Sequence, residues 1–258
     1  MAEPRRLLVV VAHPDDETFG TGSIIAHHAR QGIEVTVCCA TRGEAGEAPD
    51  WLPGEADLGE VREGELRRAA ATLGAADVVV LGFGDSGMTG PAADTTLAGA
   101  PFDSVVAAVR DVVDRVDPGV VVTLDPVDTD GHRDHARIGQ ASIEACAGRA
   151  GIAVYAWTVA RPVLARWFEE LELLRPETEH LDLDREGFGR PEQDITTVVD
   201  TSDVLDVRLR ASAQHRSQTP PFDGMSEDLR TLFLTRDTLV RIWPPWSGGQ
   251  VEDRLSWP

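Results

Sequence analysis

The chain has 258 residues, of which 42% are hydrophobic and 26% charged, as in an ordinary globular protein with a sizeable core. Its formal net charge of −20 disfavours binding to nucleic acid and to anionic membrane surfaces, so neither is an expected partner. Three cysteines without regular spacing argue against a disulfide framework. No secretory signal is visible and the first apolar run is too short to span a bilayer, so we expect a cytoplasmic protein.

Short valine-rich apolar runs alternate with segments of helical spacing over the first 157 residues. Runs without a polar face are typical of strands that are buried on both sides. The alternation therefore predicts an α/β fold with a mostly parallel sheet and helices on both faces. The predicted strands are 7–12, 35–40, 78–82, 120–124 and 152–157, and the predicted helices are 24–31, 61–73, 102–116 and 136–147.

Beyond residue 158 the pattern becomes irregular. Residues 160–174 have the spacing of an amphipathic helix, 195–199 could form a late strand, and 201–214 are expected to be helical. The end of the chain, 243–258, is too rich in Pro and Gly for regular structure. With no repeat or linker, we expect a single domain over 1–258, with its core at about 5–220.

Three long connections follow predicted strands, at residues 41–60, 84–101 and 125–135. Ligands of open α/β sheets bind at the carboxyl ends of strands, where such connections gather. Together with residues 13–20, which follow the first strand, these connections are expected to border one crevice.

Two clusters of histidine and aspartate follow predicted strands. The first strand ends in His-Pro-Asp-Asp-Glu at 13–17, where crowded carboxylates repel one another unless a cation compensates them. The strand at 120–124 is followed by His132 and His135, which are flanked by Asp128, Asp130 and Asp134.

The two clusters together predict a metal site. Two imidazoles and one carboxylate with an open position form the common plan of a hydrolytic zinc centre, and His13, Asp16 and His135 would supply these ligands. Zn²⁺ suits the set, and Fe²⁺ or Mn²⁺ would also do so. Asp15 is then free to act as the base toward the metal's water, and His132 could donate a proton or stabilise an oxyanion.

Each cluster also has a simpler interpretation. Asp15 and Asp16 could only cap the following helix, and His132 and His135 could be ordinary surface residues. The occurrence of both clusters, each directly after a strand, favours a shared site. Among the other histidines we expect structural roles for His27 and His28, and find no partner pattern for His180.

The motif A-H-P-D-D-E at 12–17, placed after a first strand, is highly specific. With it the chain resembles the LmbE-like/PIG-L de-N-acetylases, which include deacetylases of mycothiol and bacillithiol biosynthesis. Shorter matching segments follow in the expected order over residues 7–220, namely TRGEAGE (41–47), VREGEL (61–66), DSGM (85–88), HRDH (132–135) and HRSQ (215–218).

The resemblance implies a Rossmann-like fold, a Zn²⁺ site and hydrolysis of an N-acyl group on a small amino-sugar or glycoconjugate substrate. It implies metal ligands at His13, Asp16 and His135, a general base at Asp15, an intermediate-stabilising His132 with Asp134 as its orienting partner, and sugar or inositol contacts from Arg62, Asp85 and Glu47.

Other roles are open for some of these residues. Arg62 could pair with Glu60 or Glu65, and Glu44 and Glu47 could be solvated loop acids. For His215 a structural role is favoured over a pocket-lining one.

The chain departs from the family pattern at two points. Arg133 replaces the proline of the usual H-P-D-H segment, and Asp130 stands where mycothiol-type members carry a tyrosine. The only tyrosine, Tyr155, lies elsewhere, so the resemblance does not establish mycothiol chemistry.

Three alternatives to an amino-sugar deacetylase are an amidase on larger conjugates such as mycothiol S-conjugates, a catalytically inactive sugar-binding homologue, and a nucleotide-binding Rossmann protein. The last lacks a G-x-G-x-x-G after the first strand. The pattern leaves the oligomeric state open, a homo-oligomer included.

Overall fold

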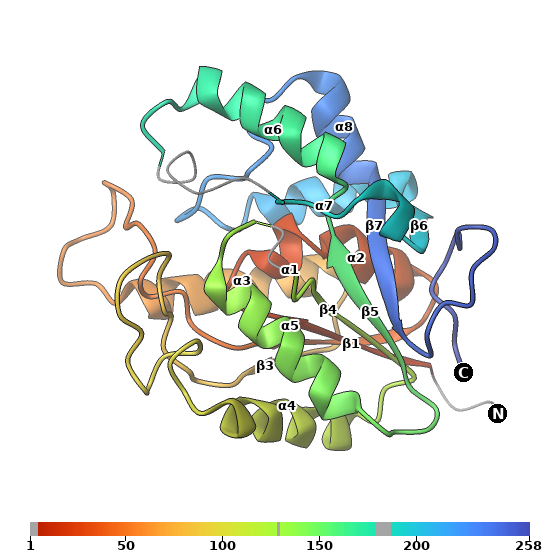
Figure 1. Ribbon diagram of the computed structural model, residues 1–258. Coiled ribbons are helices and arrows are strands. Elements are labelled where there is room, and N and C mark those ends of the chain that lie inside the picture. The colour runs from red at the N-terminus through yellow and green to blue at the C-terminus, as the bar shows by residue number, and fades with distance from the viewer. Residues whose placement is uncertain (1–4, 128–129, 179–186) are drawn as a thin grey trace.

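The computed structural model describes residues 5–127, 130–178 and 187–258, which are built around one seven-stranded sheet (Figure 1). Its strands are β1 (Arg6–Val11), β2 (Glu34–Cys39), β3 (Asp77–Val80), β4 (Val120–Leu124), β5 (Ala153–Thr158), β6 (Thr197–Asp200) and β7 (Arg236–Trp243). They lie in the order β3-β2-β1-β4-β5-β7-β6. All pairs among the first five strands are parallel, whereas β7 pairs antiparallel with β5 and β6, so the predicted mostly parallel sheet is confirmed.

Helices cover both faces of this sheet, as predicted (Figure 1). They are α1 (Asp16–Phe19), α2 (Gly22–Arg30), α3 (Leu58–Leu73), α4 (Phe102–Val116), α5 (Arg133–Cys146), α6 (Arg161–Leu174), α7 (Leu205–Ser212) and α8 (Glu227–Thr235). α4 packs against α5, while α2, α3 and α7 pack together. Local signals set the ends of α3, because Asp57 accepts a hydrogen bond from the backbone of Glu60 and Gly74 ends the helix at φ 91°. Among the described residues no helix combines the length and apolarity needed to cross a membrane.

The parallel strands carry no polar face because both of their faces are covered. Val9 of β1 pairs with Val37 of β2 and Val122 of β4, and all three side chains are fully buried. One fully buried aliphatic side chain contributes roughly 1.5–3 kcal/mol of transfer free energy, so the strand register is strongly specified. That register fixes the position at which the chain leaves each strand for the site.

The predicted end of the core, near residue 220, is wrong. β7 lies inside the sheet between β5 and β6, and Trp243 belongs to it, so the tail begins with regular structure. The strand could not be recognised from the sequence because Asp237 interrupts its apolar run. It is nevertheless buried, where its carboxylate accepts hydrogen bonds from Thr201 Oγ1 at 2.8 Å and Trp157 Nε1 at 3.0 Å.

A second, smaller apolar cluster joins α6 to α8 beside the main sheet (Figure 1). α6 confirms the helix predicted at 160–174, whereas α8 was not predicted. The cluster consists of Leu164, Trp167, Phe168, Leu171, Met225 and Leu229. The single-domain assignment stays a prediction.

Candidate active site

The site lies at the point where the strand order reverses. β1 has β2 on one side and β4 on the other, so the connections after β1 and β4 leave the sheet in opposite directions. Such switch points open a crevice at the carboxyl ends of the two strands. His13 follows β1, whereas His132 and His135 follow β4, and the three rings meet in this crevice. The centroid of the His13 ring lies 4.4 Å from that of His132 and 5.3 Å from that of His135.

Asp16 lies between the two histidines expected to bind a metal. Its Oδ2 is 3.6 Å from His13 Nδ1 and its Oδ1 is 3.3 Å from His135 Nε2. Oδ2 also accepts the backbone N–H groups of Ala12 and His13, at 3.2 and 2.8 Å, which fixes the carboxylate at the start of α1. One nitrogen of each imidazole therefore faces the same carboxylate.

The opposite nitrogen of each imidazole is held by another carboxylate. His13 Nε2 lies 3.2 Å from Asp134 Oδ2 and 3.4 Å from Asp85 Oδ1. His135 Nδ1 lies 2.6 Å from Asp130 Oδ2. Metal-binding histidines in proteins commonly have such a carboxylate partner, which fixes the tautomer and the ring orientation.

The partner role of Asp130 was not predicted. Its Oδ1 also accepts the backbone N–H of His132, at 3.0 Å. The sequence signal was an aspartate five residues before His135, which local spacing alone does not connect to that ring.

The donor set and its charges fit a divalent cation. Burial would lower the pKa of His135, but Asp130 and Asp16 raise it to about 10. Burial is likewise outweighed at His13, where Asp134, Asp16 and Asp85 raise the pKa well above its ordinary value. The carboxylates that raise these two pKa values create a negative potential at the ring nitrogens of His13 and His135, and that potential would attract a metal ion. Donor atoms of His13, His132 and His135 lie within 4.8 Å of one another, and so do those of His13, Asp85 and Asp134, so each group could surround an ion. Asp16 belongs to neither group, although its carboxylate faces the rings of His13 and His135 at 3.6 and 3.3 Å.

Asp15 is held at the edge of this cluster in an unusual backbone conformation. Its φ is 112°, a region that residues other than glycine rarely adopt. Arg62 donates to Asp15 Oδ2 at 3.0 Å, to the Pro14 carbonyl at 2.7 Å and to the Gly43 carbonyl at 2.6 Å. Burial raises the pKa of Asp15 to about 6, although Arg62 acts in the opposite direction. Arg62 therefore contacts Asp15 and not Glu60 or Glu65, the alternative pairs considered from sequence.

Two buried glutamates, Glu17 and Glu65, join α1 and α3 to the segment after α7. Glu17 Oε2 accepts the backbone N–H of Asp15 at 2.8 Å, and Glu17 Oε1 lies 2.7 Å from His215 Nε2. Glu65 accepts hydrogen bonds from the backbone N–H and the hydroxyl of Ser217, at 3.1 and 2.5 Å. The segment after α7 thus contacts α1, which follows Asp15, and α3, which carries Arg62. The resemblance of residues 215–218 to the family's H-x-S-Q segment did not specify this role.

His132 caps α5 and is poised to donate a hydrogen bond. Its Nδ1 accepts the backbone N–H of Asp134 at 3.2 Å, so the proton of the neutral ring resides on Nε2. Burial and the charges of His13 and His135 lower the pKa of His132 to about 3. The carboxylate of Asp134 is directed at His13 and at the Ser86 N–H, so it does not contact the His132 ring.

The expected sugar-contacting residues differ in their position. Asp85 has a nearly buried side chain beside His13 and accepts the backbone N–H of Gly87 at 2.9 Å. Glu44 Oε1 accepts the backbone N–H of Asp85 at 3.1 Å. Glu47 is exposed, and no described contact joins it to the histidine cluster.

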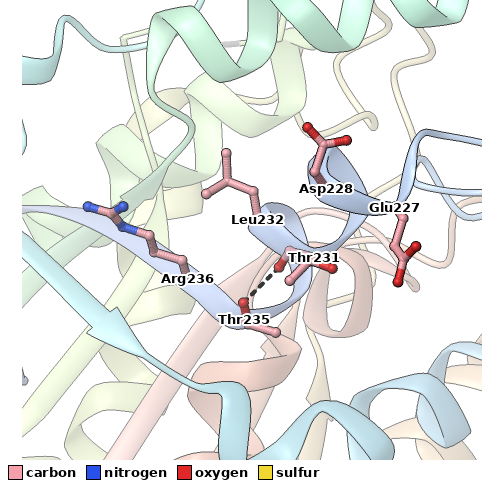
Figure 2. A pocket seen from close by; sticks show the side chains of 6 residues that line it. All are labelled: Glu227, Asp228, Thr231, Leu232, Thr235 and Arg236. Carbon is pink, nitrogen blue, oxygen red and sulfur yellow. Dashed lines mark hydrogen bonds between the residues drawn. The ribbon is translucent and has the colours of Figure 1, made fainter.

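A surface hollow of about 580 Å³ runs along α8, away from these residues (Figure 2). Its lining, Glu227, Asp228, Thr231, Leu232, Thr235 and Arg236, includes none of the cluster residues. The hollow therefore has no part in the site. His180 and Asp128 lie outside the described residues.

The fold and the cluster together define a Rossmann-like protein with a histidine–aspartate centre suited to metal-assisted hydrolysis. The chain belongs to the PIG-L family, whose model, described as GlcNAc-PI de-N-acetylase, matches residues 8–146. The family resemblance stated from the motifs is confirmed, and with it the class, an enzyme of a de-N-acetylase family.

Two relatives are named 1D-myo-inositol 2-acetamido-2-deoxy-alpha-D-glucopyranoside deacetylase. The one from Rhodococcus opacus is 40% identical over 238 residues, covering 83% of this chain and 82% of the relative. The one from Acidothermus cellulolyticus is 35% identical over 246 residues, covering 87% of this chain and 84% of the relative. Both matches cover more than four fifths of this chain.

Solved structures share the fold at lower identity. N,N'-diacetylchitobiose deacetylase from Pyrococcus horikoshii superposes with a TM-score of 0.62 at 22% identity, covering 93% of this chain and 84% of that one. GalB, the 4-carboxy-2-hydroxymuconate hydratase from Pseudomonas putida KT2440, gives a TM-score of 0.63 at 22% identity, covering 95% and 99%. The same fold thus carries a deacetylase and a hydratase, so the chemistry must be argued from the site.

Proposed function

We propose that the protein is a Zn²⁺-dependent deacetylase that removes the N-acetyl group of an N-acetylglucosamine glycoside, with an inositol-like aglycone as in the named activity of its relatives. The observation that carries the proposal is the arrangement of His13 and His135. Each turns one nitrogen toward Asp16 and has the other held by a carboxylate. His13, Asp16 and His135 would hold the ion, which when bound would polarise the amide carbonyl and lower the pKa of water to about 7.

Asp15 is the residue that takes the proton from the attacking water. Its carboxylate is fixed by Arg62 at 3.0 Å, and its backbone by Glu17. With a pKa of about 6, Asp15 is ionised at neutral pH and is basic enough to accept a proton from the attacking water. The same proton can then pass to the departing nitrogen of the sugar.

His132 stabilises the oxyanion through Nε2–H. Its Nδ1 is occupied by the backbone N–H of Asp134, which leaves the other nitrogen as the donor. A neutral imidazole suffices for this role, in agreement with the lowered pKa of His132. Loss of one such donor typically slows a reaction by about 10²–10³.

An amine-release assay on 1D-myo-inositol 2-acetamido-2-deoxy-alpha-D-glucopyranoside tests the proposal. The protein is stripped of metal and reloaded with Zn²⁺, Fe²⁺ or Mn²⁺ in separate arms. We expect release in at least the Zn²⁺ arm and none after chelation. Cleavage of bulkier N-acyl conjugates alone would instead indicate an amidase. Glycoside binding without turnover in any arm would indicate an inactive sugar-binding homologue.

A further inference from the structure

The side chain of Arg133 binds the loop that follows β3. Its Nε donates to the Gly87 carbonyl at 2.8 Å, and its Nη1 donates to the Gly90 carbonyl at 2.7 Å. Its Nη2 donates to the carbonyls of Ser86 and Thr89, the latter at 3.0 Å. In the part of the chain that the structure describes, the hydrogen-bond acceptors of this guanidinium are thus four backbone carbonyls of a single loop.

The backbone at position 133 does not itself require an arginine. Arg133 is the first residue of α5, and His132 before it has φ −87° and ψ 111°. Proline is favoured at the first position of a helix, and an extended residue is the kind that precedes a proline. A proline would therefore fit here, so the contribution of the arginine has to come from its side chain.

Two backbone amides of the same loop bind the carboxylates that face His13. The N–H of Ser86 donates to Asp134 Oδ2 at 2.9 Å, and the N–H of Gly87 donates to Asp85 Oδ1 at 2.9 Å. The same two oxygens lie 3.2 and 3.4 Å from His13 Nε2. The guanidinium thus holds the carbonyls of the two loop residues whose amides hold these carboxylates.

The orientation of Asp134 depends on this loop. Its side chain is fully buried, and among the described residues its Oδ1 has no hydrogen-bond partner. The carboxylate is therefore oriented through Oδ2, which contacts Ser86 and His13. A shift of the loop would leave a buried carboxylate oxygen without its amide donor, which is an unfavourable state.

We propose that Arg133 is a positioning residue of the candidate metal site. By binding the four carbonyls it fixes the loop, and through the loop it holds the carboxylates of Asp85 and Asp134 against His13 Nε2. The inference rests on the proposed function, in which His13 would hold the ion. A carboxylate partner orients a ligand histidine, and loss of such a partner typically weakens metal binding by about 10–100-fold.

This role runs against the charge of the arginine. A cation near the site would by itself repel a divalent metal ion, so removal of the guanidinium charge alone should tighten metal binding. Removal of its hydrogen bonds should instead weaken metal binding, because the carboxylates on His13 lose their support. The direction of the change therefore separates the two effects.

Zinc affinity, measured by competition with a chelator, tests the proposal. Arg133→Pro removes the guanidinium while suiting the start of α5, and Arg133→Met removes it while keeping the length of the side chain. We expect both variants to bind Zn²⁺ about tenfold more weakly than the wild type. Arg68→Met removes an exposed arginine of α3 and should bind like the wild type. Affinities in the Arg133 variants equal to or above that of this control would overturn the proposal.

Hydrogen exchange of the metal-free protein, followed by NMR, reads the loop directly. The amides of Ser86 and Gly87 should exchange about tenfold faster in both Arg133 variants, while the amide of Val9 in the core strand β1 exchanges as in the wild type. The Val9 amide thus controls for a general loss of stability. Unchanged exchange at Ser86 and Gly87 would also overturn the proposal. If the wild type binds no Zn²⁺, the proposed function fails, and the exchange of these two amides alone decides whether Arg133 positions the carboxylates.

Discussion

His215 Nε2 lies 2.7 Å from Glu17 Oε1, although 198 residues separate the two along the chain. Both side chains are fully buried. Burial would lower the pKa of His215, but Glu17 raises it, so the two form a buried charged pair. The pair joins the first turn after β1, which carries Asp15 and Asp16, to the segment after α7.

Replacing His215 with leucine should destabilise the protein strongly, because Glu17 would remain buried without its partner. Breaking a buried pair in this way typically costs about 3–5 kcal/mol of the free energy of unfolding. Urea denaturation measures the loss. The double variant Glu17→Gln/His215→Leu should lose less than the sum of the two single variants, because both remove the same interaction. Additive losses would mean that the two side chains do not interact.

His135→Ala should remove the metal together with the activity, because Nε2 of this ring faces Asp16 at 3.3 Å. Elemental analysis of the purified variant, set beside the wild type, measures the metal. His27→Ala is a matched control, since His27 pairs with Asp203 outside the site, and it should keep the wild-type metal content. One retained ion per chain in His135→Ala would refute the ligand assignment.

Asp130→Asn should weaken metal binding by about 10–100-fold without abolishing it, as is typical when the carboxylate partner of a ligand histidine is lost. The reason is the 2.6 Å contact between Asp130 Oδ2 and His135 Nδ1. Competition with a chelator measures the affinity. Asp206→Asn, which alters an exposed aspartate paired with Arg210, should bind metal like the wild type. Equal affinities in the two variants would count against a role for Asp130.

Asp15→Asn should retain the metal and lose turnover by about 10²–10⁴, the usual contribution of a general base. Asparagine preserves the side-chain shape and can accept a hydrogen bond from Arg62, but it does not take up a proton. Single-turnover amine release, compared at equal metal content, measures the loss. A rate within a few-fold of the wild type would assign the base to another residue.

Stability should fall on acidification because of His28. Its ring is buried in α2 and Nδ1 donates to the Ile24 carbonyl at 2.7 Å, and burial lowers its pKa to about 4. The unfolded chain, with an ordinary histidine pKa of about 6.5, binds the proton more readily, so the contribution is present above pH 6.5 and is lost as the pH falls toward 4. From pH 7.5 to 5 the loss is about 2 kcal/mol.

Urea denaturation at the two pH values, for the wild type and His28→Gln, checks this contribution. Glutamine cannot titrate, so the variant should show a shallower pH dependence, whatever its stability at pH 7.5. An unchanged dependence would mean that the pKa of His28 is the same in the folded and the unfolded protein.

The parallel part of the fold was predictable because its signal is local. Strands such as β1 and β4 are buried on both faces, so an unbroken apolar run marks each of them. β7 was missed because it is an antiparallel insertion whose apolar positions are interrupted by Asp237 and Arg241. Asp237 is tolerated there only because Thr201 and Trp157 hydrogen-bond to it, and neither is near it in sequence.

The amino-acid sequence by itself determined that histidines and aspartates stand directly after β1 and β4, and hence that they meet at one edge of a parallel sheet. Only the tertiary structure decided that Arg62 contacts Asp15, that Asp130 holds His135, and that His215 and Ser217 brace the site from the far end of the chain. The physical reason is that the strand register sets where the backbone leaves the sheet. The direction of each side chain, and the partner that satisfies its charge, depends on the packing of segments that local spacing does not connect.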